Sequence, residues 1–141
     1  MQSDSSVARL AAWAATADAS DPALTGSAAA AFADTLACIL AGRADSATQA
    51  VLKGAEATHG TGPAALWGLG TTLSPAGAAL VTGTAAHALD YDDNFAPAMS
   101  HASAVLVPAL LAMAAGRPAI KGDDLMQAYV IGLEVQARIG A

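Results

Sequence analysis

The sequence predicts an all-α fold of about six helices in one domain over residues 1–141. Alanine, which has the strongest helix propensity, accounts for 40 of the 141 residues. Aromatic residues make up 4% of the chain, and runs of β-branched residues are almost absent, so little material remains for a sheet. Apolar residues recur at helical spacing, and no repeat or low-complexity linker divides them. The expected helices cover residues 7–18, 23–41, 46–59, 75–90, 102–115 and 123–141.

Proline, glycine and capping residues set the ends of the three N-terminal helices. The first ends before Pro22, because the residue that precedes a proline is pushed out of the helical region. The second stops at Gly42. Asp45 or Ser46 can cap the third, and the turn segment 60–63 ends it. The second helix has an apolar stripe that consists of Leu24, Ala28, Phe32, Leu36, Ile39 and Leu40.

The C-terminal half contains the one segment that suits an extended conformation. Residues 64–68 are bounded by turn residues and predict a short strand. Ser74 and Pro75 then start the fourth helix as its N-cap and first-turn residue. The fifth helix is apolar and should be central and buried, with Pro108 either kinking it or marking its start. Asp123 is expected to cap the last helix.

The charge and composition of the chain exclude several classes of partner. Twelve acidic residues against six basic ones give a formal net charge of −6, which disfavours nucleic acids and anionic membranes. The N-terminus lacks the basic region of a secretory signal, and the longest apolar stretch, 102–116, is too short to cross a bilayer. Cys38 is the single cysteine, so the chain cannot form a disulfide framework of its own. We therefore expect a soluble, cytoplasmic protein.

The candidate functional residues gather between the fourth and fifth expected helices. This cluster consists of His87, Asp90, Asp92, Asp93 and His101. His87 and Asp90 lie three residues apart and share a helix face, and His101 returns to the same region across a loop. A carboxylate beside an imidazole in a partly buried pocket can tune an acid and a base for proton transfer. The alternatives are that the acids lie in solvent or near a helix end, and that His87 only packs against its neighbours.

Known metal-binding spacings do not fit this cluster. A calcium loop that begins at Asp90 would need Gly at its sixth position and Glu at its twelfth, where the chain has Phe95 and His101. A zinc site built from His87, one Asp and His101 has suitable ligand types but no recurring metal-ligand spacing. We therefore expect no metal ion at this site.

Several stretches of the chain resemble the MmgE/PrpD family. The run GTAAHALDYDD at residues 83–93 and the run SHASAVLVPALLA at residues 100–112 are similar to the signature of that family. Residues 34–42 resemble its early helix, and residues 122–140 resemble a later one. The resemblance extends over nearly the whole chain from about Val7.

The resemblance implies the N-terminal part of the helical domain of an enzyme that needs no cofactor and is usually a homodimer. The family includes 2-methylcitrate dehydratase, cis-aconitate decarboxylase and iminodisuccinate epimerase, which act on small di- or tricarboxylates. Its catalytic Asp and His correspond to Asp90 and His101, with Asp93 as the alternative to Asp90. Asp93 and Asn94 correspond to substrate-binding positions, although the family often has Thr where this chain has Asn94.

The expected function follows from this resemblance and from the residue types. We expect the intact polypeptide to be a lyase or isomerase, most often a 2-methylcitrate dehydratase-like enzyme that removes a proton next to a carboxylate. The six basic residues lie more than fifteen residues from Asp90, so cationic groups for the substrate must come from elsewhere. The family's lid domain is absent from this chain, so we expect a homo-oligomer or a downstream lid-bearing polypeptide as partner, and an open, acidic half-site at Asp90 and His101. The alternative is a non-catalytic helical module or pseudoenzyme that needs a partner chain.

Overall fold

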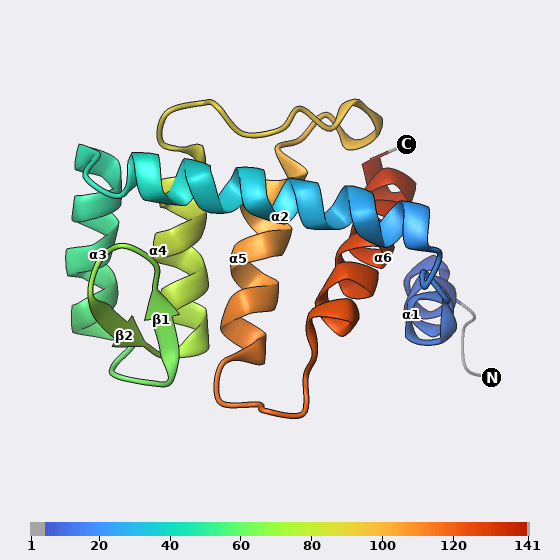
Figure 1. Ribbon diagram of the computed structural model, residues 1–141, viewed down its shortest axis with the longest axis horizontal. Helices are drawn as coiled ribbons and strands as arrows, with labels where there is room; N and C mark the ends of the chain where they lie inside the picture. Colours follow the sequence, from blue (N-terminus) through green and yellow to red (C-terminus); the bar gives the residue numbers. More distant parts are fainter. Residues whose placement is uncertain (1–4, 141) are drawn as a thin grey trace.

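The computed structural model describes residues 5–140, which form six α-helices, one two-stranded hairpin and one short 3-10 helix (Figure 1). The all-α prediction is confirmed, because the hairpin is the only sheet within these residues. The elements are α1 (Ser6–Thr16), α2 (Pro22–Gly42), α3 (Ser46–Thr58), β1 (Ala64–Leu66), β2 (Thr71–Leu73), α4 (Pro75–His87), η1 (Ala96–Ala98), α5 (Ala102–Ala114) and α6 (Gly122–Gly140).

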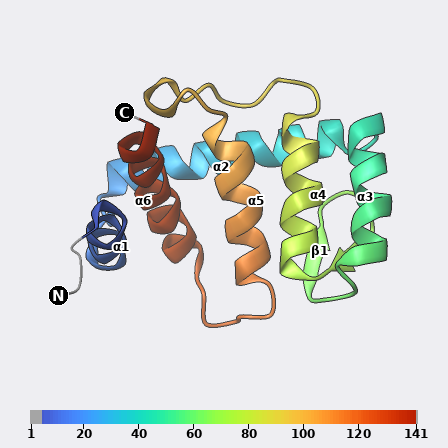
Figure 2. The same ribbon diagram turned by 180° about the vertical axis from the view of Figure 1, so that it is seen from behind.

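Four helices lie side by side in one layer, in the order α3, α4, α5 and α6 (Figure 1). Helix α2 crosses one face of this layer and packs against α4, α5 and α6, while α1 packs beside α6. Figure 2 shows the layer from behind, where none of the described helices crosses α4 and α5. Helix α5 is central, as the sequence predicts, and the segment that joins α4 to α5 runs along one end of the layer.

Side-chain caps start two of the helices where the sequence predicts them. The Asp45 carboxylate accepts a hydrogen bond from the Ala47 N–H at 2.8 Å at the start of α3. The Ser74 hydroxyl accepts one from the Gly77 N–H at 3.3 Å, and Pro75 occupies the first turn of α4. These boundaries depend on local hydrogen bonds, so the sequence is sufficient to predict them.

The start of α6 differs from the prediction. The helix begins at Gly122, and Asp123 therefore lies in its first turn rather than at the N-cap. Asp124 makes the capping contact instead, because its carboxylate accepts a hydrogen bond from the Lys121 N–H at 2.8 Å. The prediction that Asp123 caps this helix is therefore wrong, and the next residue, Asp124, makes the contact.

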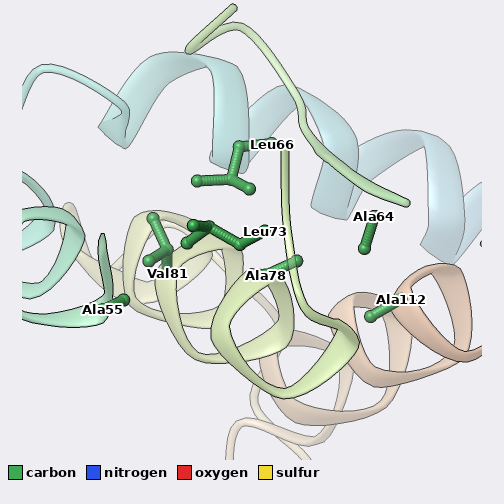
Figure 3. Packing of buried hydrophobic residues seen from close by; sticks show 7 residues of the cluster. All are labelled: Ala55, Ala64, Leu66, Leu73, Ala78, Val81 and Ala112. Carbon is green, nitrogen blue, oxygen red and sulfur yellow. The ribbon is translucent and has the colours of Figure 1, made fainter. Parts of the chain in front are cut away.

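The hairpin was only half predicted by the sequence. The extended segment at 64–68 appears as β1, but its antiparallel partner β2 was not expected. Gly68 and Gly70 turn the chain back between the strands, with φ angles of 77° and 69° that favour glycine. Leu66 and Leu73 are 2% and 3% exposed, and they join the buried cluster formed with α3, α4 and α5 (Figure 3). This burial, rather than strand propensity, stabilises the short pair.

Small residues let α2 and α4 approach each other closely. A Cβ atom added to Gly42 would overlap the carbonyl oxygen of Ala85 on α4. Ile39 and Ala85 are 1% and 0% exposed at this crossing. Larger rings fill the junction of α2 with α6, where Phe32 and Tyr129 meet edge to face with centroids 5.6 Å apart.

The apolar stripe predicted for α2 is correct at its centre and wrong at both ends. Phe32 and Ile39 are buried, but Leu24 and Leu40 are 46% and 43% exposed. The buried face also includes Thr35, whose hydroxyl donates to the helix backbone at 2.8 Å. Because α2 is apolar on most of its surface, only its neighbours determine which stripe is covered.

Helix α2 is also long and apolar enough to cross a membrane, with 21 residues and a mean hydropathy of 1.5 in its most apolar window. The core helix of a soluble domain meets the same criterion. In this fold α2 packs across α4, α5 and α6. The expectation of a soluble, cytoplasmic protein stays a prediction.

Pro108 lies inside α5 and is fully buried, so it does not mark the start of that helix at Ala102. Proline has no N–H, and the carbonyl of Ala104 therefore lacks its usual helical donor. Gly83 of α4 comes close to this carbonyl, since an added Cβ would stand 3.1 Å from the Ala104 oxygen. Helices α4 and α5 thus approach closely along the edge of the candidate site.

Candidate active site

The segment between α4 and α5 folds back so that its two ends meet. Asp90 has a φ angle of 55°, a left-handed conformation that Asp tolerates better than most residues. Further along, the Phe95 N–H donates to the Ser100 carbonyl at 2.8 Å and closes an isolated antiparallel bridge. The chain returns through this bridge, and His101 before α5 comes beside His87 at the end of α4, with ring centroids 4.4 Å apart.

Asp92 lies between these two histidines. Its side chain is 0% exposed. One carboxylate oxygen, Oδ1, is 2.9 Å from His87 Nδ1, and the other, Oδ2, is 3.3 Å from His101 Nδ1. A buried carboxylate requires compensation, and His87 supplies it with a hydrogen bond to Oδ1. Oδ2 faces His101 Nδ1, and within residues 5–140 neither of these two buried atoms forms a hydrogen bond of standard geometry.

Asp90 and His101 lie close together, because His101 returns across the loop to the same region, as the sequence predicts. Asp90 Oδ1 lies 3.9 Å from His101 Nε2. The Asp90 side chain is 78% exposed and that of His101 is 35% exposed, so both can be reached by a small molecule. Their catalytic roles stay a prediction.

The pKa of His87 is raised above its ordinary value of 6.5. The hydrogen bond to Asp92 is the main cause, burial acts in the opposite direction, and the negative charges of Asp92 and Asp90 raise the pKa further. The cationic form of His87 is therefore more populated near neutral pH than it would be for a free imidazole.

Asp93 is engaged at the start of α5. Its Oδ1 accepts a hydrogen bond from the Ser103 N–H at 2.9 Å, and the Ser103 hydroxyl lies 2.6 Å from the Tyr129 hydroxyl on α6. Burial raises the pKa of Tyr129, so this phenol stays neutral. Asn94 is exposed and makes no side-chain hydrogen bond within residues 5–140. The expected substrate-binding roles of Asp93 and Asn94 stay predictions.

A cavity of about 780 Å³ opens beside the two histidine rings. Its wall is mostly small and apolar, and no Lys or Arg from residues 5–140 lines it. The apolar part of the wall includes Ala79, Leu80, Ala88, Ala104, Val105 and Ala109. No acidic side chain from residues 5–140 lines this wall, whereas Asp90 is exposed beside His101, so the expectation of an open, acidic half-site stays a prediction.

Four side chains of the cluster could also hold a metal ion, since one ligand atom from each lies within 4.8 Å of the others. They are His87, Asp90, Asp92 and His101. Imidazole and carboxylate are ligand types that first-row divalent metals accept. The close contact of His87 Nδ1 with Asp92 Oδ1, however, already satisfies both atoms. The expectation of no metal ion stays a prediction.

Asp92 is the residue for which the sequence analysis found no separate role. Asp90, Asp92 and Asp93 are adjacent in sequence, and helical spacing singles out Asp90 beside His87. The left-handed backbone at Asp90 ends that periodicity, so spacing no longer predicts the direction of later side chains. The available signal was two histidines flanking three acids, which indicates a cluster but not its centre.

Two kinds of known protein are similar to this chain. Residues 8–141 match the family model described as the MmgE/PrpD N-terminal domain, as the sequence resemblance predicts. Cis-aconitate decarboxylase from Mus musculus and the same-named protein from Homo sapiens are each 41% identical over 70 residues. The matched segment is 48% of this chain and 14% of each relative, so it spans only a small part of their length. No solved structure gives a significant match.

Proposed function

Because the chain belongs to the MmgE/PrpD family, we propose that it carries the proton-transfer site of a lyase or isomerase for a small di- or tricarboxylate. The observation that supports this most is the contact of His101 Nε2 with Asp90 Oδ1, at 3.9 Å, beside a cavity. The specific reaction that we propose is dehydration of a 2-methylcitrate-like acid. Decarboxylation, the reaction named for the two relatives, is the alternative. In that reaction carbon dioxide leaves with cleavage of a carbon–carbon bond, and an acid of the site gives a proton to the carbon that keeps the electron pair.

The proposed chemistry begins with a base that removes a proton from the carbon next to a substrate carboxylate. His101 Nε2 accepts this proton, and the electron pair of the broken C–H bond forms the new carbon–carbon double bond. Hydroxide leaves from the adjacent carbon, takes a proton from an acid in the site and departs as water. Asp90 Oδ1 lies 3.9 Å from His101 Nε2, the atom that receives the proton.

A substrate with two or three carboxylates also requires cationic groups. Arg138 is engaged elsewhere, since it pairs with Glu134 at 3.4 Å and stacks over Trp13 at 4.4 Å from the ring centroid. No Lys or Arg from the described part of the chain lines the cavity. We propose that a second copy of the chain, or a lid-bearing polypeptide encoded downstream, supplies these groups. We also propose that the assembled enzyme works in the cytoplasm and needs no cofactor.

The same lack of cationic groups favours a second candidate function. A helical domain with a mostly apolar cavity wall could serve as a non-catalytic module or pseudoenzyme that associates with a partner chain. Such a domain would show no turnover in any combination.

Turnover measurements distinguish these two functions. The chain is assayed alone and together with the downstream polypeptide on hydroxy-tricarboxylates, cis-aconitate and iminodisuccinate. We expect turnover only in the combination, and we expect His101→Asn to reduce it about 100-fold or more. His59→Asn is the matched control, because His59 is exposed and contacts Thr58 at the end of α3. Full turnover of His101→Asn would exclude the catalytic role, and no turnover on any substrate would favour the non-catalytic module.

A further inference from the structure

We propose that Asp92 is a positioning residue that keeps a hydrogen on Nδ1 of both His87 and His101, and that His87 is a second proton-carrying group of the site. This inference rests on the proposed proton-transfer function. The pairing of Asp90 with His101 gives no role to Asp92 or His87, and this inference assigns one to each.

The two oxygens of Asp92 divide between the two imidazoles. Oδ1 is 2.9 Å from His87 Nδ1, and Oδ2 is 3.3 Å from His101 Nδ1. An ionised carboxylate only accepts hydrogen bonds, so His87 Nδ1, which forms the hydrogen bond to Oδ1, carries the hydrogen. We assign the same arrangement to His101, because its Nδ1 faces Oδ2 at 3.3 Å. In the neutral imidazole the other nitrogen, Nε2, then holds the lone pair. Both rings are therefore held in the same tautomer, with Nε2 as the atom that gains or loses a proton.

Burial leaves Asp92 and His101 no other partner for this contact. Asp92 Oδ2 and His101 Nδ1 are both inaccessible to solvent, and within the described residues neither forms a hydrogen bond of standard geometry. The two atoms face each other at 3.3 Å. A contact of this kind shortens when the imidazole becomes cationic, because charged hydrogen bonds are shorter and stronger. Asp92 therefore holds His101 most firmly in the state that forms after proton abstraction.

His87 is placed to carry a proton beside His101. Its side chain is 51% exposed and lines the same cavity. The ring centroids of His87 and His101 are 4.4 Å apart, so two cationic rings would repel each other. One buried carboxylate between them balances a single positive charge. The favoured charge state of the three side chains therefore has one cationic ring and one neutral ring. The cationic ring can donate a proton and the neutral ring can accept one, so the same cavity holds an acid and a base.

Few other ionisable groups face the rings within residues 5–140, and the charge of the exposed Asp90, which favours a cationic ring, is screened by solvent. Asp90 is the further acid that faces them, and its side chain is 78% exposed. Helices α4 and α5 contribute no Lys, Arg, Asp or Glu within their bounds. On α2, burial raises the pKa of Cys38, and the nearby charges of Asp34, Asp92 and Asp93 raise it further, so this thiol stays neutral.

Nitrogen NMR of the three histidines tests the positioning role without a substrate. The chain is labelled with ¹⁵N-histidine and observed well above the ordinary histidine pKa. We expect both His87 and His101 to carry hydrogen on Nδ1. In Asp92→Asn the amide has one accepting oxygen and one donating NH₂ group, so one ring should move its hydrogen to Nε2 and the pKa of His87 should fall.

Controls are available within the same chain. His59 is an internal reference whose signals should not move, and Asp45→Asn makes the same chemical change at the cap of α3. A wild-type His101 with its hydrogen on Nε2 would overturn the positioning role, and so would an Asp92→Asn variant with both rings unchanged. If Asp92→Asn does not fold, the wild-type spectrum decides the question by itself.

Kinetics of the active combination test the role of His87. We expect His87→Gln to lower kcat at least tenfold with little change in KM and to remove one limb of the pH profile. A His87→Gln variant with an unchanged pH profile would overturn this role. If the NMR result is as expected but no substrate is turned over, the proposed function fails, and the role of His87 fails with it, while the positioning by Asp92 stands.

Discussion

Asp92 shows how a single carboxylate can organise a site from beneath the surface. Its side chain is fully buried, yet both of its oxygens face imidazole nitrogens. Removal of one partner would leave a buried charge without compensation, which is costly in protein interiors. The conformations of His87 and His101 are therefore coupled through Asp92, although the two histidines lie on different helix ends.

The raised pKa of His87 predicts how stability depends on pH. The pKa is raised above 6.5 in the folded chain by Asp92. The stabilisation from His87 is therefore fully present below 6.5 and is lost as the pH rises through the raised pKa. We expect the stability difference between wild type and His87→Gln to shrink on going from mildly acidic to alkaline pH. Urea unfolding at several pH values measures it.

The control for this measurement is His59→Gln, which changes an exposed histidine outside the cluster. The stability difference between wild type and His59→Gln should not follow the pH dependence expected for His87→Gln. A difference between wild type and His87→Gln that stays constant with pH would contradict the raised pKa.

At the scale of elements, the close crossing of α2 over α4 holds the layer together. Gly42 permits this approach, because there is no room for a Cβ beside the Ala85 carbonyl. Alanine buries little area per side chain, so close backbone approach replaces large interlocking residues in this core. The end of α4 that carries His87 is positioned by this crossing.

A matched pair of glycine substitutions on α2 tests this packing. Gly42→Ala should destabilise the chain by about 3 kcal/mol or more, because the added methyl overlaps the backbone of α4. Gly26→Ala on the same helix should instead stabilise it by about 0.5–1 kcal/mol, since nothing lies within 4 Å of the added methyl. Chemical unfolding measures both. Equal effects of the two substitutions would contradict the close crossing.

The whole molecule is one helical layer with α2 on a single face (Figure 2). Apolar side chains are exposed on this layer, since Leu80 on α4 and Val105 on α5 are 49% and 62% exposed and both line the cavity. Val107, two residues further along α5, is 0% exposed. Helix α5 therefore packs into the core on one side and lines the cavity on the other.

Substitutions on the two sides of α5 should change different properties: dye binding on the cavity side and stability on the core side. Val105→Gln should lower the fluorescence of a bound hydrophobic dye and change stability by no more than about 0.5 kcal/mol. Val107→Ala should leave dye binding to the folded chain unchanged and cost about 2 kcal/mol of stability. Dye titration and thermal unfolding measure the two effects. A large loss of stability in Val105→Gln would show that this side chain is part of the core.

The sequence alone determined the six helices and the place of the cluster. Helix starts at Asp45 and Ser74 depend on hydrogen bonds two or three residues away, so local patterns were enough to predict them. The family resemblance also follows from short runs of residues.

Only the tertiary structure decided which side chains of these elements are buried and which partners they meet. The exposure of Leu40, the pairing of β2 with β1 and the burial of Asp92 depend on neighbours that approach in space. The sequence leaves three aspartates chemically alike, and their surroundings make them different. Packing removes water from Asp92, and the two histidines that replace that water come together only when α4 and α5 are held side by side.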